Sequence, residues 1–344
     1  MRRSERSLHV LTTTASTGAL LAGALTLALA PVVLAALRRW HVLDLPTPRS
    51  SHVQATPRGG GLAPAAGALV VLAVTDVITG DARVALAVAG AGFGLAGAVE
   101  DLRGVPPAPR LLSQVAMAVA TLPWLLSGLG GHGLWRVTFG IGVVAWLIAY
   151  VNAFNFMDGV NGLSAVQVVV AGVTWWAVGE WQDVHTLAAG GLVVAAAAFA
   201  FAPFNFPRAR MFLGDVGSYF FGGWLAVLAV LALRHGLPVE AALAPLSVYL
   251  ADTGLTLARR VARHEAWFQP HRDHAYQRLV ALGWTHSRVT ATVGAAIAGC
   301  SCLGAVSLVG VPWARALADA VLAGVLTAYL ISPSLLRRRA SIEP

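Results

Sequence analysis

One stretch of the chain places polar side chains at a spacing that chemistry could use. Residues 152–163 read NAFNFMDGVNGL, so that Asn152, Asn155, Asp158 and Asn161 recur at three-residue intervals. One Asn or Asp between two helices would only stabilise a turn. Four in register, with glycines that let a ligand approach the backbone closely, predict a site for phosphate or a metal–phosphate complex.

Two adjacent carboxylates end an earlier apolar segment. Glu100 and Asp101 precede Arg103, and a solvated helix end would explain them as well as a functional role would. Carboxylates at a membrane boundary are functional by default, and Mg²⁺ is usually held by one or two carboxylates together with substrate phosphates. The pair is therefore a candidate metal site.

A third motif surrounds Asp215. Residues 208–218 read RARMFLGDVGS and lead into an apolar segment, so Asp215 could be no more than a helix N-cap. The N–H groups and the dipole at a helix start also favour an anionic ligand. Together with Glu100, Asp101 and Asp158, Asp215 forms a carboxylate cluster with metal-binding potential.

The longest hydrophilic connection carries histidines. Residues 270–279 read PHRDHAYQRL, and a helix there would place His271, His274 and Arg278 on one face. An amphipathic interfacial helix explains this pattern without any function. Binding of a pyrophosphate by His and Arg is the functional interpretation, and the other motifs favour it.

The first connection is rich in proline, glycine and basic residues. Asp44, Arg49 and His52 lead to Arg58 and a run of glycines. The stretch could be a stiff connector. Its Arg and His side chains could equally hold a lipid phosphate at the membrane surface.

The elements that must position these motifs are apolar helices. Of the 344 residues, 57% are hydrophobic and 12% are charged, and the mean hydropathy is +0.70, whereas a soluble domain carries about 25% charged residues. We therefore predict an all-α fold, a polytopic integral membrane protein, in which residues 1–344 form one domain. With about 20 apolar residues for each span, eleven transmembrane helices are expected, near 15–37, 61–79, 83–99, 111–128, 134–151, 163–180, 185–203, 217–233, 239–257, 288–310 and 313–332.

The distribution of arginine predicts the orientation in the membrane. Most of the 24 basic residues, all of them arginine, lie in the C-terminal tail and the connections that carry the motifs. The positive-inside rule makes these segments cytoplasmic and puts the N-terminus outside, although Arg2, Arg3 and Arg6 oppose it. The net charge of +8 thus reflects membrane orientation, and no nucleic-acid partner is expected. The cytoplasmic connections are 38–60, 100–110, 152–162, 204–216 and 258–287.

The motifs, in this order, resemble those of the polyprenyl-phosphate N-acetylhexosamine-1-phosphate transferases, glycosyltransferase family 4. The matching pieces are the loop from Asp44 to Gly60, the acidic pair followed by Arg110-Leu111, the run from Asn152, FLGDVGS from Phe212, and the motif at His271. Two positions depart from the family. Glu100 replaces the usual aspartate, and HRDHAYQR replaces three neighbouring histidines, which resembles the branch that begins O-antigen and related polysaccharide chains.

This resemblance implies a reaction. A sugar 1-phosphate would pass from a UDP-N-acetylhexosamine to polyprenyl phosphate, usually undecaprenyl phosphate, with release of UMP. The enzyme would lie in the inner membrane of a bacterial cell, and its product would begin a lipid-linked cell-envelope polysaccharide. Mg²⁺, or Mn²⁺ in its place, would be the cofactor, and a homodimer is compatible with the family.

The resemblance also implies roles for individual residues. The catalytic residues would be Asp101, Asp158, Asp215 and His271, and the metal ligands would be Asp215, Asp101 and Glu100. Contacts to the substrates would come from Asp44, Arg49, His52, Arg110, Asn152, Asn155, Asn161, Arg272 and His274.

Two other classes of membrane protein carry polar residues in such an environment. A transporter or flippase of lipid-linked substrates would show inverted repeats and discontinuous helices near the midplane, and no internal repeat is visible in the sequence. A phosphatase acting on polyprenyl diphosphate could use the same acidic cluster, and it stays open as an alternative.

Overall fold

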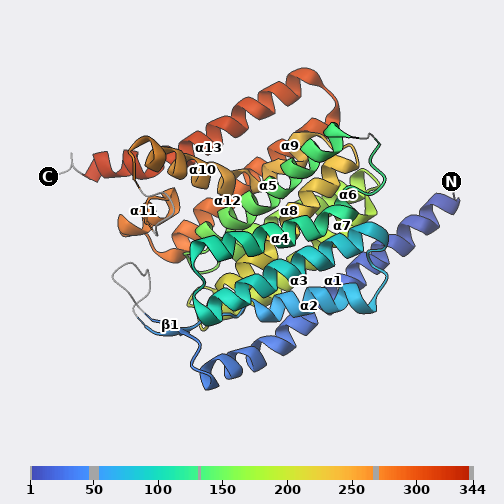
Figure 1. Ribbon diagram of the computed structural model, residues 1–344. Coiled ribbons are helices and arrows are strands. Elements are labelled where there is room, and N and C mark those ends of the chain that lie inside the picture. The colour runs from blue at the N-terminus through green and yellow to red at the C-terminus, as the bar shows by residue number, and fades with distance from the viewer. Residues whose placement is uncertain (1, 46–53, 131–132, 266–270, 341–344) are drawn as a thin grey trace.

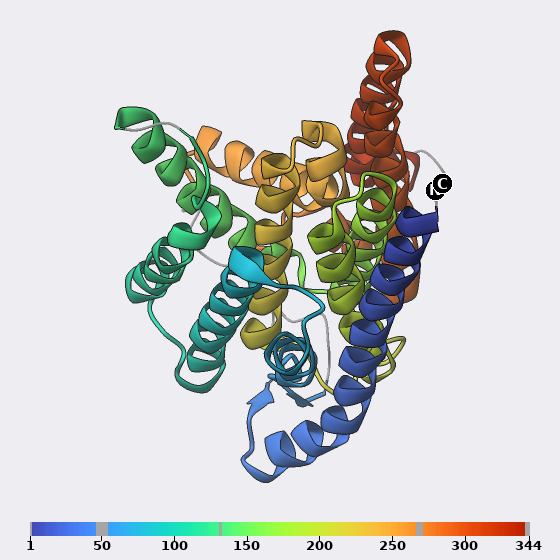
Figure 2. The same ribbon diagram turned by 90° about the vertical axis from the view of Figure 1, so that its right-hand side faces the viewer.

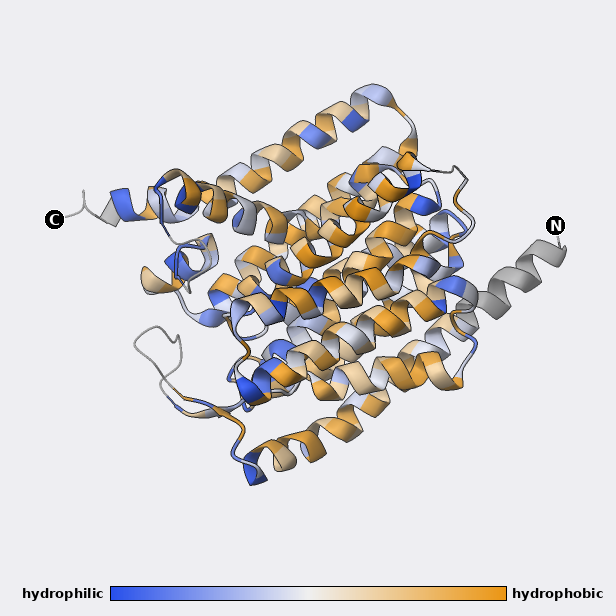
Figure 3. Ribbon diagram, in the orientation of Figure 1, coloured by the Kyte–Doolittle hydropathy of each residue, from blue (hydrophilic) through white to orange (hydrophobic). Residues whose placement is uncertain are grey.

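The protein is a bundle of long helices. A computed structural model describes residues 2–45, 54–130, 133–265 and 271–340, and most of its long helices run side by side along one direction (Figure 1). Hydrophobic residues dominate the middle of the bundle, and hydrophilic residues collect at its ends, notably the end that carries α11 and β1 (Figure 3). The predicted all-α architecture is therefore confirmed.

The elements follow one another in a simple order, with a single two-stranded antiparallel ribbon among the described residues. Each predicted apolar segment coincides with one helix or with a run of two or three consecutive helices. The bounds are α1 (Arg2–Arg39), β1 (Leu43–Asp44), β2 (Thr56–Pro57), α2 (Leu62–Val74), α3 (Gly80–Arg103), α4 (Pro107–Leu125), α5 (Leu134–Met157), α6 (Leu163–Trp181), α7 (His185–Asn205), α8 (Gly214–Arg234), α9 (Val239–Leu243), η1 (Ala244–Leu246), α10 (Ser247–Ala262), α11 (Ala275–Ala281), α12 (His286–Ala305), η2 (Val306–Val309) and α13 (Pro312–Ala340).

Nine helices of the described residues are long and apolar enough to cross a membrane, two fewer than the predicted eleven. Helix α2 has 13 residues, which at about 1.5 Å per residue is too short for a hydrocarbon core of about 30 Å. Helix α4 has 19 residues but also contains Arg110, Gln114 and an internal proline, Pro123, and these residues lower its hydropathy. The chain is a multi-pass membrane protein.

Helix α8 is the central element of the bundle. In its apolar span 94% of the residues are buried, against 22% in α1 and 17% in α13, which lie at the periphery with apolar surface exposed to lipid. Helix α3 packs on α8 through Gly97, where an added Cβ would overlap the backbone carbonyl of Asp215. This close approach brings the C-terminal end of α3 against the first turn of α8.

The two ends of the chain lie at opposite ends of the bundle (Figure 1). Helix α1 begins at one end, and α13 finishes at the other, beside α11. Turning the molecule by 90° shows α1 and α13 as outer helices that flank the bundle (Figure 2). The predicted orientation of the two termini in the membrane stays a prediction.

Candidate active site

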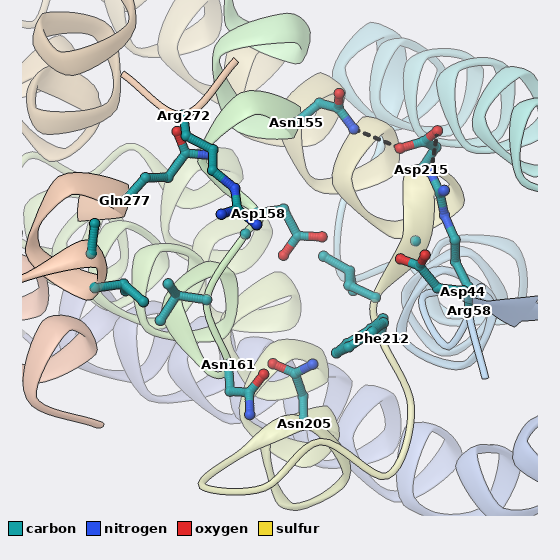
Figure 4. Close-up of a pocket in the computed structure, with 16 residues that line it drawn as sticks. Asp44, Arg58, Asn155, Asp158, Asn161, Asn205, Phe212, Asp215, Arg272 and Gln277 are labelled. Atoms are coloured by element: carbon teal, nitrogen blue, oxygen red, sulfur yellow. Dashed lines mark hydrogen bonds and ion pairs between the residues drawn. The ribbon is translucent and has the colours of Figure 1, made fainter. Parts of the chain in front are cut away.

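The end of the bundle that carries α11 contains a polar cavity of about 390 Å³. Four segments that are distant in sequence converge there: the first connection, the 152–162 motif, the start of α8, and the residues around α11 (Figure 4). The lining residues are Asp44, Arg58, Asn155, Asp158, Gly159, Val160, Asn161, Asn205, Phe212, Leu213, Gly214, Asp215, Arg272, Gln277, Val280 and Ala281.

The start of α8 is fixed by a carboxylate from another helix. The Asp101 Oδ1 and Oδ2 atoms accept hydrogen bonds from the backbone N–H groups of Asp215 and Val216, each at 2.9 Å. Gly214 adopts the left-handed φ of +76°, and a Cβ there would meet Asp101 and Gly59. Because N–H groups in the first turn of a helix have no intrahelical partner, Asp101 does the work of an N-cap for α8.

Arg58 links two carboxylates. Its Nε lies 2.6 Å from Asp101 Oδ1, and its Nη2 lies 2.7 Å from Asp215 Oδ2. Burial lowers the pKa of Arg58, but Asp215, Asp101 and Asp44 together raise it above its ordinary value, so the guanidinium stays charged. The cation offsets the repulsion between two acidic side chains held in one buried place.

The 152–162 motif contributes Asn155 and Asp158 to the cavity. Asn155 Nδ2 donates to Asp215 Oδ1 at 2.7 Å and to Ser218 Oγ at 3.0 Å. The Ser164 hydroxyl donates to Asp158 Oδ1 at 2.6 Å. Burial raises the pKa of Asp158 to about 7. This carboxyl group therefore changes charge near neutral pH, and a cation bound in the cavity would favour its ionised form.

Two asparagine side chains, those of Asn161 and Asn205, also line the cavity. Asn161 Nδ2 donates to the Pro207 carbonyl at 3.2 Å, and Asn205 Oδ1 accepts from the Gly162 N–H at 2.7 Å. Gly162 is left-handed, with a φ of +80°. The two amide side chains thereby tie the 152–162 motif to the segment that leads into α8.

Several predicted residues lie beside the cavity without lining it. Asn152 Nδ2 donates to Gln114 Oε1 at 2.7 Å, one helical turn before Asn155. Glu100 Oε2 accepts from the Val105 N–H at 3.2 Å, and Glu100 Oε1 lies 3.8 Å from Arg110 Nη1. Glu100 and Arg110 therefore face each other near the end of α3.

His271 and His274 pack against aromatic rings beside the cavity. His274 is 2% exposed, and its Nδ1 lies 3.4 Å from Asp252 Oδ1. His271 packs on Phe156 and His274, and burial lowers its pKa. Neither imidazole lines the cavity, whereas Arg272 between them does. The predicted residues Arg49 and His52 lie outside the described part of the chain.

The donor set around Asp215 fits a magnesium ion. Across the described residues no group of three or more His, Cys, Asp or Glu side chains converges, and Asp101 already binds the first turn of α8. The carboxylates of Asp158 and Asp215 both face the cavity (Figure 4). One or two carboxylates plus substrate phosphates are the usual Mg²⁺ site, so these two residues are the candidate ligands.

The sequence reasoning missed several residues that build the site. Arg58 was grouped with the first connection but given no partner, and Asn205, Phe212 and Gln277 were not singled out as cavity residues. Asp252 was overlooked although a carboxylate inside an apolar segment is an available signal. It is 1% exposed and holds the histidine segment in place.

Together these observations define a polytopic membrane protein with a charged cavity at one end, suited to a phosphorylated ligand. The sequence model of glycosyl transferase family 4 matches residues 83–233, which contain Asp101, Asn155, Asp158 and Asp215. This stretch is less than half of the chain, and over it the chain is similar to the family.

Three relatives show the extent of the similarity. The chain is 27% identical to the probable undecaprenyl-phosphate N-acetylglucosaminyl 1-phosphate transferase of Bacillus subtilis, over 76% of this chain and 75% of the relative. It is 28% identical to the decaprenyl-phosphate N-acetylglucosaminephosphotransferase of Mycobacterium leprae, over 73% of each. It is 27% identical to the undecaprenyl-phosphate alpha-N-acetylglucosaminyl 1-phosphate transferase of Escherichia coli, over 74% of each.

Asp158 should make the stability of the metal-free protein depend on pH. In the folded state the Asp158 carboxyl keeps its proton up to about pH 7, whereas in the unfolded chain it loses the proton near pH 4. Protonation of Asp158 therefore stabilises the folded state fully below about pH 4, and this contribution is lost as the pH rises through about 7. With a chelator present, we expect the Tm to fall more between about pH 5 and pH 8 in wild type than in Asp158→Asn. Parallel curves for the two proteins would contradict the assignment.

Proposed function

We propose that the protein transfers an N-acetylhexosamine 1-phosphate from a UDP-linked sugar to polyprenyl phosphate and releases UMP. The observation that carries this proposal is the cavity in which Asp158 and Asp215 face Arg58 and Arg272 at one end of a membrane-spanning bundle. The names of the relatives support both the phosphosugar and the polyprenyl phosphate. The O-antigen branch and the homodimer stay predictions from the resemblance.

The cavity suits a small, strongly anionic ligand. Its volume of about 390 Å³ falls within the range of roughly 300–1,000 Å³ that is usual for ligand pockets. Arg58 and Arg272 bring positive charge to opposite walls (Figure 4). Arginine is well suited to phosphate because its planar guanidinium donates two parallel hydrogen bonds. A nucleoside diphosphate sugar is thus the class of donor that the cavity favours.

The reaction needs positioning and charge neutralisation more than acid–base chemistry. An oxygen of the lipid phosphate attacks the phosphorus that bears the sugar, and a new P–O bond forms. The bond from that phosphorus to the oxygen bridging to UMP breaks, and UMP leaves with the electron pair. A phosphate monoester has a second pKa of about 6, so the attacking oxygen is already ionised at neutral pH. Arg58 and Arg272 offset the negative charge of the two substrates.

Asp215 and Asp158 are the proposed ligands of Mg²⁺, with Mn²⁺ able to take its place. When bound, the ion neutralises the charge of the donor diphosphate. Asn155 orients the Asp215 carboxylate through Oδ1. Asp101 fixes the backbone from which Asp215 projects, so its proposed part is to position Asp215. Glu100 is directed to Val105 and Arg110, which does not support the expected metal role for Glu100.

Replacement of Asp215 by Asn should abolish most turnover while the protein stays folded. The amide keeps the shape of the side chain but removes one charge from the metal site, which should cost about 3 kcal/mol or more of transition-state stabilisation, roughly a hundredfold in rate. Mn²⁺ binding, followed by electron paramagnetic resonance, should weaken in parallel. Asp76→Asn, at an exposed position, is the matched control. Normal Mn²⁺ binding by Asp215→Asn would remove Asp215 from the metal site.

The bond that breaks can be identified with an isotope. Purified protein is incubated with polyprenyl phosphate, Mg²⁺ and a UDP-N-acetylhexosamine labelled in the β-phosphate. The label should enter the lipid fraction together with the sugar, UMP should be the nucleotide product, and added UMP should drive the reaction backward. Labelled UDP beside an unlabelled glycolipid would show attack on the sugar carbon instead. Unchanged UDP-sugar would leave a flippase or a phosphatase as the better assignment.

The cavity is proposed to face the cytoplasm of a bacterial cell, in the inner membrane, with the N-terminus outside. The arginines of the connections around the cavity support this orientation through the positive-inside rule, and so does the need for a nucleotide donor. Single cysteines at Arg263 and Arg338 should resist a membrane-impermeant thiol reagent applied to intact cells. Labelling of both positions would reverse the proposed topology.

A further inference from the structure

A buried carboxylate outside the cavity organises the segment that follows α10. Asp252 lies within the apolar span Val239–Ala262 and is 1% exposed. Its Oδ1 accepts from the Ala275 N–H at 2.9 Å and from the Thr256 hydroxyl at 3.3 Å, and it lies 3.4 Å from His274 Nδ1. Its Oδ2 accepts from the Tyr329 hydroxyl at 2.6 Å. A carboxylate buried in an apolar span needs such donors.

Asp252 anchors the first turn of α11. That helix has seven residues and no side-chain cap of its own at His274. An isolated helix of this length is unstable in water, so its position depends on tertiary contacts. The bond from the Ala275 N–H to Asp252 satisfies one of the N–H groups that a helix start leaves without a partner.

Helix α11 in turn forms one wall of the cavity. Arg272, just before the helix, and Gln277, within it, both line the cavity opposite Asp215 (Figure 4). Tyr276 is buried, and its hydroxyl donates to the Phe156 carbonyl at 2.8 Å, at the end of α5. A shift of α11 would therefore move a cationic wall and disturb the backbone next to Asp158.

The Tyr329 hydroxyl connects this system to the C-terminal helix. Helix α13 is otherwise exposed along most of its apolar span, but Tyr329 is 5% exposed at its contact with Asp252. Arg278 Nη2 adds a second contact by donating to the Ser334 hydroxyl at 2.9 Å. Figure 1 shows α10, α11 and the last part of α13 together at the cavity end of the bundle.

We infer that Asp252 and Tyr329 are positioning residues for the transfer reaction: the pair holds α11 so that Arg272 and Gln277 face the donor in the cavity. This inference rests on the proposed function. It gives the C-terminal helix a part in donor binding although no residue of α13 lines the cavity.

The test is Tyr329→Phe in the full-length protein in detergent. The substitution keeps the ring and removes one hydrogen-bond donor to the Asp252 carboxylate, so we expect effects of about tenfold or more. Amide hydrogen exchange in residues 275–281 should accelerate, the Kd for UMP should rise, and the KM for the UDP-sugar should rise with it. The KM for polyprenyl phosphate should stay at the wild-type value, which a general loss of structure would not allow.

The matched control is Ser332→Ala. Ser332 lies in α13 like Tyr329, and its hydroxyl donates within the same helix, to the Tyr329 carbonyl at 2.7 Å. Exchange in 275–281 and UMP binding should stay at wild-type values in this variant. The inference fails if Tyr329→Phe matches wild type in both measurements or if Ser332→Ala changes them equally.

A double-mutant cycle separates the pair from other effects. Asp252→Asn keeps one acceptor for the Ala275 N–H but loses the charge, and combined with Tyr329→Phe it should add little, because both changes break the same contact. Fully additive losses in UMP binding would overturn the inference. Exchange and UMP binding need no turnover, so an inactive wild-type protein would count against the proposed function alone.

Discussion

The geometry of the site depends on the contact between the Asp101 carboxylate and the first N–H groups of α8. Both oxygens of Asp101 are used, one on Asp215 and one on Val216. Since α8 is the most buried helix of the bundle, fixing its first turn fixes where the Asp215 side chain emerges. A helix start carries partial positive charge, so the anion stabilises the helix while the helix stabilises the anion.

Arg58 completes this balance of charge. Two carboxylates in a poorly hydrated place would repel each other, and one of them would take up a proton. The guanidinium at 2.6 and 2.7 Å offsets the repulsion between the Asp101 and Asp215 carboxylates. Burial raises the pKa of Asp158, further along the cavity, to about 7, so this carboxyl group is partly protonated near neutral pH. The site thus combines two carboxylates bridged by Arg58 with one carboxyl group, Asp158, whose charge responds to what the cavity holds.

The sequence predicted those parts of the fold that depend on local composition. Apolar runs give helices because length and hydropathy act over neighbouring residues, so the helix positions were correct, and α2 failed as a span only because its run is short. Contacts between residues that are distant in the sequence could not be predicted from the sequence. The partner of Arg58 is Asp215, 157 positions later, and the burial of His274 is decided by Asp252, 22 positions earlier. The residue types were enough to predict the chemistry of the site, whereas tertiary packing determines which side chains line the cavity.

The close packing of α3 on α8 at Gly97 limits which sequences can encode this site. An added Cβ would overlap the carbonyl of Asp215, and every other amino acid has that atom. Any single substitution at Gly97 therefore disturbs the packing of α3 on α8. Asp101 lies one helical turn further along α3, so any change that pushes the two helices apart also draws the carboxylate away from α8. Substitutions at Gly97 should accordingly be poorly tolerated, although this residue carries no reactive group.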